Sequence, residues 1–196
     1  MTPDVDEAVR VLEAGGLVVY PTDTLFGLGA RIGDPTAVAR VFDVKRRPRG
    51  QPLSVAVATV DDLERYAHVT PLAKRLYGLL PGPLTIVLEK RSTVPDVVTG
   101  GRSDVGLRIP DHPVALELLR RVGPLTCTSA NLHGHDDPAS LAGAQMELGD
   151  RVDYYVPSPT PLLGAASTLV DARGVTPRVL RAGAVVADQI RRCIAY

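Results

Sequence analysis

The chain has 196 residues, of which 45% are hydrophobic and 22% charged, so it is long enough to bury one substantial core. Its 22 Lys and Arg residues are balanced by 22 Asp and Glu residues, which excludes a global field attracting nucleic acid or an anionic membrane. No apolar run reaches the roughly 18 residues that span a bilayer, no signal segment opens the chain, and the two cysteines suit a reducing compartment. We therefore expect one cytoplasmic domain, residues 1–196, with no membrane contact and any charged partner bound by a local patch.

Apolar periodicity and turn residues predict alternating helices and strands. From the N-terminus, the predicted order is helix 5–14, strand 17–20, a glycine-spaced apolar segment 25–32, helix 35–46, strand 53–58, helix 61–66, helix 71–80 and strand 84–89. The order continues with strand 105–109, helix 113–122, strand 125–128, helix 139–148, strand 152–156, a closing strand pair at 167–171 and 178–180, and helix 187–194.

Three connections lack a regular pattern. Residues 91–104, with two adjacent glycines and scattered Pro and Ser, are predicted to be a mobile loop. Residues 133–138 are predicted to be a polar turn, and 157–163 a proline-rich connector. The alternation, without a repeat or a composition break, predicts an α/β fold: one layered domain around a central sheet.

The highest local charge lies in residues 45–53, which we call the basic loop. Four positive charges fall within five residues (Lys45, Arg46, Arg47 and Arg49), and Pro48 and Pro52 restrict the backbone. A guanidinium offers a planar fork for two phosphate oxygens and an ammonium a point charge, so the basic loop is a candidate anion site. The alternative is a solvated basic turn.

Polar segments follow several predicted strands, where ligand contacts are common in α/β sheets. Pro21-Thr22-Asp23-Thr24 presents ligand-binding groups, or forms a turn in which Asp23 bonds its own backbone. Thr128-Ser129-Ala130-Asn131 can cradle an anion, or cap a turn. Arg108, near the end of another strand, brings a cation to the same kind of position.

Several familiar sites are missing. The sequence has no Gly-x-x-x-x-Gly-Lys-Ser/Thr loop, no Gly-x-Gly-x-x-Gly after a strand and no Gly-x-Ser-x-Gly turn. His133 and His135 are a possible metal pair, but a solvated loop is the better interpretation, and no histidine shows zinc-like spacing with cysteine. We therefore predict no metal ligand from protein side chains and assign no catalytic nucleophile.

Seven segments of the chain form an ordered set of short motifs. They are Gly16-Leu-Val-Val-Tyr-Pro-Thr-Asp-Thr-Leu-Phe-Gly-Leu28, Lys45-Arg-Arg-Pro48 with Gln51-Pro-Leu53, Pro81-Gly-Pro-Leu-Thr85, Gly106-Leu-Arg-Ile-Pro110, Thr128-Ser-Ala-Asn131, Ser167-Thr-Leu-Val-Asp171, and Leu180-Arg181 with Gly183. Each is weak alone, but the set covers nearly the whole chain. In this order they resemble the YrdC/Sua5 family of L-threonylcarbamoyladenylate synthases, in its short single-domain form.

The resemblance implies a YrdC-like α/β fold, a single-domain twisted mixed sheet flanked by helices with a basic concave face. It also implies a nucleotidyltransferase reaction. L-threonine, bicarbonate and ATP, the last bound with Mg²⁺, would give threonylcarbamoyl-AMP and pyrophosphate. The product would feed N6-threonylcarbamoylation of adenosine 37 in tRNA through downstream transferase proteins. A direct contact with tRNA or double-stranded RNA is also compatible with the resemblance.

The family's site residues are carried over onto matching positions. The implied ATP-binding set is Lys45, Arg47, Arg49, Ser129, Asn131 and Arg181, and the implied threonine-binding set is Thr22, Arg108 and Ser167. We expect Lys45 and Arg47 to neutralise the triphosphate and Arg108 to pair with the threonine carboxylate. Fixed cations can stabilise the charge of adenylyl transfer while the carbamate of threonine supplies the nucleophile.

Three positions depart from the family's pattern. Gln51 stands where many relatives have Lys or another polar residue, so Arg49 is a possible substitute for that phosphate contact. Ala56 stands where many have His, and Phe26 where Tyr is common. The alternatives to the synthase are a non-catalytic double-stranded RNA or tRNA-binding module of the same fold, a carbamoyl-transfer domain of hydrogenase-maturation type, and a ligand binder inactivated at Ala56.

Overall fold

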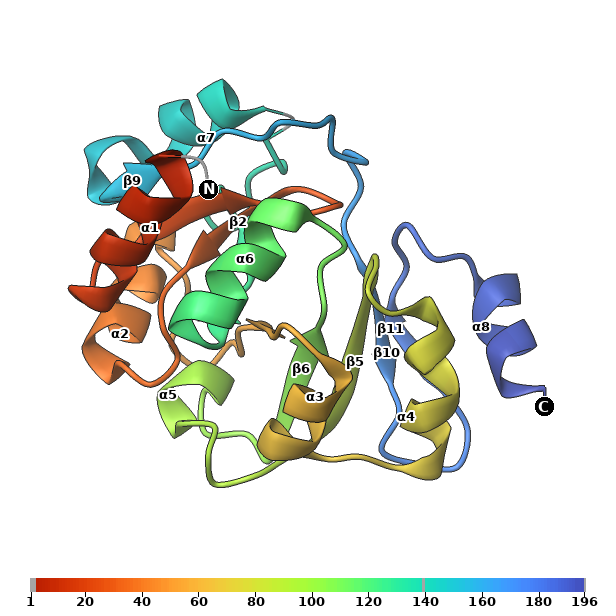
Figure 1. Cartoon of the computed structure of the whole chain (residues 1–196). Helices are drawn as coiled ribbons and strands as arrows, with labels where there is room; N and C mark the ends of the chain where they lie inside the picture. Colours follow the sequence, from red (N-terminus) through yellow and green to blue (C-terminus); the bar gives the residue numbers. More distant parts are fainter. Residues whose placement is uncertain (1–2, 139, 196) are drawn as a thin grey trace.

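Within residues 3–138 and 140–195, which a computed structural model describes, the strands form two twisted sheets (Figure 1). The smaller sheet has the order β8-β2-β1-β9 and consists of β1 (Val18–Pro21), β2 (Phe26–Gly29), β8 (Thr128–Ser129) and β9 (Tyr154–Tyr155). The larger has the order β11-β10-β5-β6-β3-β7, with β4 (Ala67–His68) paired to β5. Its other strands are β3 (Val55–Ala56), β5 (Leu84–Lys90), β6 (Asp104–Arg108), β7 (Leu125–Thr126), β10 (Thr168–Asp171) and β11 (Arg178–Arg181).

Helices flank both sheets (Figure 1). They are α1 (Pro3–Glu13), α2 (Pro35–Lys45), α3 (Val60–Tyr66), α4 (Pro71–Arg75), α5 (Asp96–Thr99), α6 (Pro113–Val122), α7 (Leu141–Leu148) and α8 (Ala187–Ile194). Local capping explains the predicted starts: the Asp34 carboxylate accepts from the backbone N–H groups of Thr36 and Ala37, both at 3.0 Å. No helix in the described part of the chain is both long and apolar enough to cross a membrane.

Strand β1 is buried on both faces because its side chains alternate between two hydrophobic clusters. Val18 and Tyr20 belong to a cluster with α1 and α6, while Val19 belongs to a larger one with α2. The predicted mixed α/β class is therefore confirmed, with two sheets where we expected one central sheet.

The chain passes from one sheet to the other at Cys127. Leu125 and Thr126 pair with β3 in the larger sheet, whereas Thr128 and Ser129 pair with β2 in the smaller one. The sequence predicted a single strand at 125–128, because a hydrophobic pattern does not reveal which partner each residue has. This crossing brings the edges of the two sheets together.

Most helices and strands were predicted with the correct type, but several are shorter in the structure than the predicted ranges. Residues 71–80 split into α4 and a 3₁₀ segment, Leu76–Leu79, and only Val55–Ala56 of the predicted strand 53–58 is paired. Helix α7 begins after the cap Ser140, and Ala139, the predicted first residue, lies outside the described residues.

The prediction of a mobile, patternless loop at 91–104 was wrong about its structure. The segment contains α5, and Val94 and Val98 are buried in the larger cluster. Three valines within five residues (Val94, Val97 and Val98), interrupted by Pro95, are too short a run to show helical periodicity, which explains the error. The segment supports the basic loop, because Leu53 donates its N–H to the Val98 carbonyl at 2.8 Å.

Two partly exposed arginines pair with the buried carboxylate of Asp104 at the start of β6. Asp104, 5% exposed, accepts from Arg102 Nε at 2.8 Å and contacts Arg173 Nη1 at 2.8 Å. The hydrogen bond with Arg102, with the charges of both arginines, lowers the pKa of Asp104. A lowered pKa adds stability above the unfolded value, and that stability is lost as the pH falls through the folded value.

We expect Asp104→Asn to lower the free energy of unfolding by about 1–3 kcal/mol at pH 7. The difference from wild type should shrink as the pH falls below about 4, where the wild-type carboxylate also becomes protonated. Urea unfolding at several pH values measures it, with the exposed Glu13→Gln as the control. A difference that did not depend on pH would contradict the ionic interpretation.

Candidate functional site

A polar cleft lies where the two sheets meet. Its polar lining is Thr22, Thr24, Ser54, Thr85, Thr128, Ser129 and Ser167, with the guanidinium groups of Arg47, Arg108 and Arg181. Leu25, Phe26, Leu53 and Cys127 add apolar surface. Asp137 is the one acidic residue of the lining within the described residues, so the cleft favours an anionic ligand.

The basic loop has a defined conformation that fixes Arg47. Helix α2 ends with Arg46 in the left-handed conformation, φ 51°, which turns the chain back. Arg47 donates from Nε to the Gln51 carbonyl at 3.3 Å and from Nη2 to the Pro52 carbonyl at 3.0 Å. Burial, and then the charge of nearby Arg181, lower the pKa of Arg47, although an arginine stays protonated at neutral pH. Two like charges are therefore held in one cleft.

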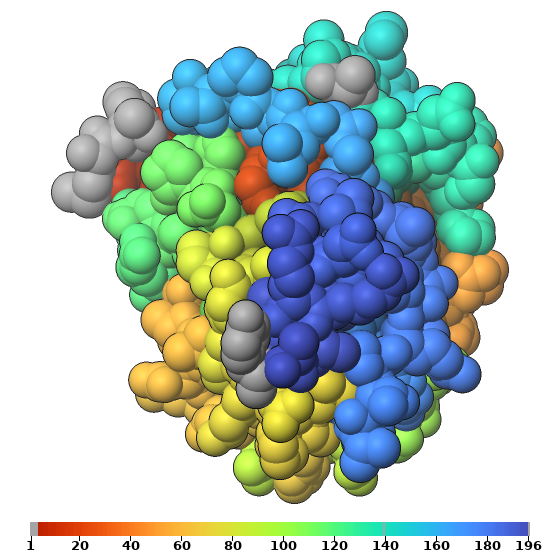
Figure 2. All heavy atoms as spheres, turned by 90° about the vertical axis from the view of Figure 1, so that its right-hand side faces the viewer, coloured from red at the N-terminus to blue at the C-terminus, as the bar shows by residue number. Residues whose placement is uncertain are grey.

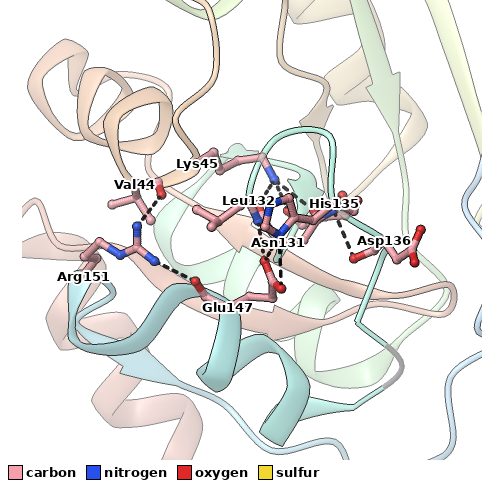
Figure 3. Close-up of polar contacts among 9 residues, drawn as sticks. Val44, Lys45, Asn131, Leu132, His135, Asp136, Glu147 and Arg151 are labelled. Atoms are coloured by element: carbon pink, nitrogen blue, oxygen red, sulfur yellow. Dashed lines mark hydrogen bonds and ion pairs between the residues drawn. The ribbon is translucent and has the colours of Figure 1, made fainter.

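Lys45 lies behind the cleft and is only 2% exposed. Its Nζ donates to the Asn131 carbonyl at 2.6 Å and to Asn131 Oδ1 at 3.1 Å (Figure 3). It also donates to the Ser129 carbonyl at 2.5 Å. Burial is the largest influence on its pKa, which falls to about 8. In this arrangement the ammonium is occupied by backbone carbonyls and holds the end of β8.

The side chain of Asn131 also makes its hydrogen bonds within the protein. Its Nδ2 donates to the His135 carbonyl at 2.7 Å, and its Oδ1 accepts from Ser129 Oγ at 2.7 Å (Figure 3). Glu147 completes this support by accepting from the N–H of Leu132 at 3.2 Å. Asn131 therefore shapes the loop after β8, and Ser129 is the member of the pair that reaches the cleft.

A buried ion pair between Arg108 and Asp23 lies at the end of the cleft formed by the 22–24 turn. Arg108, 4% exposed, donates from Nη2 to Asp23 Oδ1 at 2.5 Å and from Nη1 to Thr24 Oγ1 at 2.8 Å. Thr22 Oγ1 donates to the Leu25 carbonyl at 2.6 Å, so a turn closed by a hydroxyl group is present. The Asp23 carboxylate, which could have bonded its own backbone, pairs with Arg108 instead. Arg108 Nε and Asp23 Oδ2 are buried without a partner among the described residues, which leaves a donor and an acceptor for a ligand.

Another wall of the cleft is formed by Ser167, which immediately precedes β10. Ser167 Oγ lies 2.8 Å from Thr85 Oγ1, and Arg181 Nη2 donates to the Ser167 carbonyl at 2.8 Å. Gly183 packs directly against this wall: a Cβ there would lie 2.3 Å from the Ala166 carbonyl oxygen and 2.7 Å from that of Ser167. Only glycine fits without moving the wall.

We expect Gly183→Ala to lower the free energy of unfolding by about 1–3 kcal/mol, because the clash is with backbone. Gly33→Ala is the matched control, since its Cβ would meet nothing within 4 Å, and should change it by less than about 0.5 kcal/mol. Denaturant unfolding compares the two variants. Equal stabilities would show that residues 166–167 give way freely.

The structure separates the carried-over residues into two groups. Arg47, Ser129, Arg181, Thr22, Arg108 and Ser167 line the cleft. Lys45 and Asn131 stand behind it, and Arg49 points away, with Nη2 2.6 Å from Asp43 Oδ1 and its guanidinium 5.5 Å from the centre of the Phe42 ring. Their predicted ATP contacts stay predictions.

Two further lining residues, Thr24 and Thr128, belong to the polar segments that the sequence had offered as ligand-binding candidates. Sequence reasoning gave no such role to Ser54, Thr85, Cys127 and Asp137, although Thr85 lies inside a motif that we had quoted. Ser54 and Cys127 had no local signal, because they face the cleft only after the two sheets meet.

The prediction that protein side chains do not form a metal centre stays a prediction. Within residues 3–138 and 140–195, no three His, Cys, Asp or Glu residues are grouped so that they could hold a metal ion. His135 Nδ1 lies 3.0 Å from Glu147 Oε2 instead.

Comparison with known proteins decides the family. A family model for Sua5, YciO and YrdC proteins, described as "Telomere recombination", matches residues 10–183. The chain belongs to the Sua5/YciO/YrdC family. The resemblance drawn from the seven segments is thus confirmed.

Relatives and solved structures agree with this assignment. A protein of Mycobacterium tuberculosis, named a putative threonylcarbamoyl-AMP synthase, is 40% identical over 93% of this chain and 85% of its own length. Pyrococcus abyssi Sua5, solved with L-threonine, superposes with a TM-score of 0.93 at 34% identity; the match covers 97% of this chain but 57% of the longer Sua5 chain. Escherichia coli YciO has a TM-score of 0.86 at 27% identity, covering 95% of this chain and 92% of YciO.

Proposed function

We propose that this Sua5/YciO/YrdC-family protein is an L-threonylcarbamoyladenylate synthase, a nucleotidyltransferase that makes threonylcarbamoyl-AMP and pyrophosphate from L-threonine, bicarbonate and ATP. The observation that carries the proposal is the cleft itself, which is lined by the side chains of Arg47, Arg108 and Arg181 and by several hydroxyl groups. A triphosphate and an amino-acid carboxylate both need such donors. Relatives named threonylcarbamoyl-AMP synthase support the choice.

The positions of the side chains suggest which residues would bind the phosphates and which would bind threonine. Arg47 and Arg181 approach one region of the cleft and would neutralise the phosphates, with the Ser129 hydroxyl beside them. Arg108 would use its free Nε toward the threonine carboxylate while Asp23 and Thr24 hold its other nitrogens. Thr22 and Ser167 would complete that end.

Positioning and electrostatics would then supply most of the catalysis. The threonine amine and bicarbonate combine to a carbamate, releasing water. A carbamate oxygen attacks the α-phosphorus of ATP, and the bond to the pyrophosphate oxygen breaks. Guanidinium groups held by backbone carbonyls, as Arg47 is, need no rearrangement as charge develops on the leaving group.

Mg²⁺ would enter with ATP. The cleft offers it one carboxylate, Asp137, among the described residues. This suits an ion whose other ligands are phosphate oxygens and water, as is usual for Mg²⁺ with nucleotides. Mg²⁺ would neutralise phosphate charge there, and the arginines would orient the phosphates.

We further propose that residues 1–196 act as one domain in the cytoplasm. Its product would be passed to proteins that transfer the threonylcarbamoyl group to adenosine 37 of tRNA. Direct binding of tRNA or double-stranded RNA stays a secondary possibility, without a specific feature of the cleft in its favour.

Pyrophosphate release from ATP and bicarbonate, measured with each of the twenty amino acids, tests the proposal. We expect release that depends on L-threonine and falls sharply with serine and valine, which each lack one group of the threonine side chain. Release without any amino acid would contradict the proposal. Salt-sensitive RNA binding without ATP turnover would favour the RNA-binding alternative.

A further inference from the structure

His112 is a buried group that the proposed chemistry does not use. It immediately precedes α6 and is 2% exposed. Burial lowers its pKa, opposed by the charges of Asp23 and Asp111, so the ring is neutral at pH 7 and one nitrogen carries a proton. The hydrogen bonds of its neighbours decide which nitrogen that is.

The neighbours belong to the connector, residues 157–166, between β9 and β10. Ser158 Oγ donates to the Thr160 carbonyl at 2.5 Å, which uses its only proton. Ser158 Oγ must therefore accept from His112 Nε2, 3.1 Å away, and Thr160 Oγ1 lies 3.3 Å from the same nitrogen. His112 is thus an Nε2–H donor that holds the start of the connector.

The far end of the connector reaches the cleft. The N–H groups of Leu163 and Gly164 donate to the carbonyls of Asp23 and Thr24, both at 2.9 Å. These are the residues that hold Arg108, and the connector then runs directly into Ser167. Figure 2 shows the light-blue connector passing over the top of the molecule, next to red-orange atoms of the N-terminal segment.

The connector has few other attachments. Most of its residues are exposed, and Leu162 is the member that packs against the larger cluster within the described residues. Within the described residues, its position depends on the His112 contacts at one end and on the packing of Leu162. At the other end it depends on the two backbone hydrogen bonds and on the N–H of Ala184, which donates to the Ala166 carbonyl at 3.0 Å.

We infer that His112 is a positioning residue: by anchoring Ser158 and Thr160 it holds the connector against the 22–24 turn, and so fixes the Asp23–Arg108 pair at the amino-acid end of the cleft. Its effect on catalysis rests on the proposed function, whereas its effect on the connector does not. In the residues described here, the basic loop and β8 make no hydrogen bond with His112, Ser158 or Thr160, whereas Arg181 of the nucleotide end donates to the Ser167 carbonyl just beyond the far end of the connector.

Hydrogen exchange and steady-state kinetics of His112→Ala, His112→Gln and the double variant Ser158→Ala/Thr160→Val test the inference. His112→Ala should raise exchange of the Leu163 and Gly164 amides at least tenfold. It should raise KM for threonine at least tenfold and KM for ATP less than threefold. His112→Gln, whose amide can donate near the Nε2 position, should recover most of both effects.

The double variant removes the acceptors and leaves α6 intact, so it should reproduce His112→Ala even if that variant folds poorly. His68→Ala, an exposed histidine in β4, is the control and should match wild type. Unchanged amide exchange in the double variant, or equal increases in both KM values, would overturn the inference. If wild type itself makes no product with threonine, the proposed function fails, and amide exchange still decides the anchor.

Discussion

Arg47→Ala should lower kcat/KM for ATP by about 10²–10³-fold, the usual effect of losing one fixed donor to a developing charge. Arg47 lines the cleft, and its guanidinium is held by two carbonyls of its own loop. The substitution removes both the charge and the link across residues 47–52. Pyrophosphate release as a function of ATP concentration measures the change.

Arg49→Ala is the matched control, because it removes the same charge two residues away. Arg49 is paired with Asp43 outside the cleft, so we expect less than a threefold change. Arg47→Lys should be intermediate, since an ammonium keeps the charge but not the planar fork. If Arg49→Ala were as damaging as Arg47→Ala, net charge of the loop rather than placement of one guanidinium would control activity.

Lys45→Met should act mainly on stability, lowering the free energy of unfolding by about 2–4 kcal/mol at pH 7. Met has a similar length but cannot donate, so the carbonyls of Ser129 and Asn131 lose their buried donor. Urea unfolding at pH 7 measures the loss. Unchanged stability with lost ATP binding would show that Lys45 contacts phosphate directly.

The pH dependence provides a second check on Lys45. Its pKa is lowered to about 8 in the folded protein, so between pH 8 and about 10.4 the unfolded state binds more protons than the folded state. Wild-type stability relative to Lys45→Met should therefore rise with pH across this window. A fall would show that the charged ammonium is favoured in the folded state.

The sequence was most informative where chemistry and local pattern coincide. The charges of the basic loop and the hydroxyls of the 22–24 turn could be found without a structure, and six carried-over residues do line one cleft. What could not be predicted was which members of a motif face the ligand. Within residues 45–49, Arg47 enters the cleft, Lys45 turns inward and Arg49 outward, and this depends on the left-handed Arg46.

The departures from the family's pattern are easier to judge in the structure. Gln51 contributes its backbone carbonyl to Arg47, so its side chain is not needed for that contact. Ala56 is fully buried in β3, beside Arg108 in the strand register. Phe26 is 5% exposed and lines the cleft as apolar surface. The crossing between sheets at Cys127, which creates the cleft, depends on long-range pairing that a local pattern cannot show.

The most direct test of the proposed reaction is mass spectrometry of the product formed from ATP, L-threonine and ¹³C-bicarbonate. We predict an adenylate that contains threonine and one labelled carbon, formed together with pyrophosphate and lost in Arg47→Ala. An adenylate without the labelled carbon, or ATP turnover that yields no threonine-containing product, would contradict it.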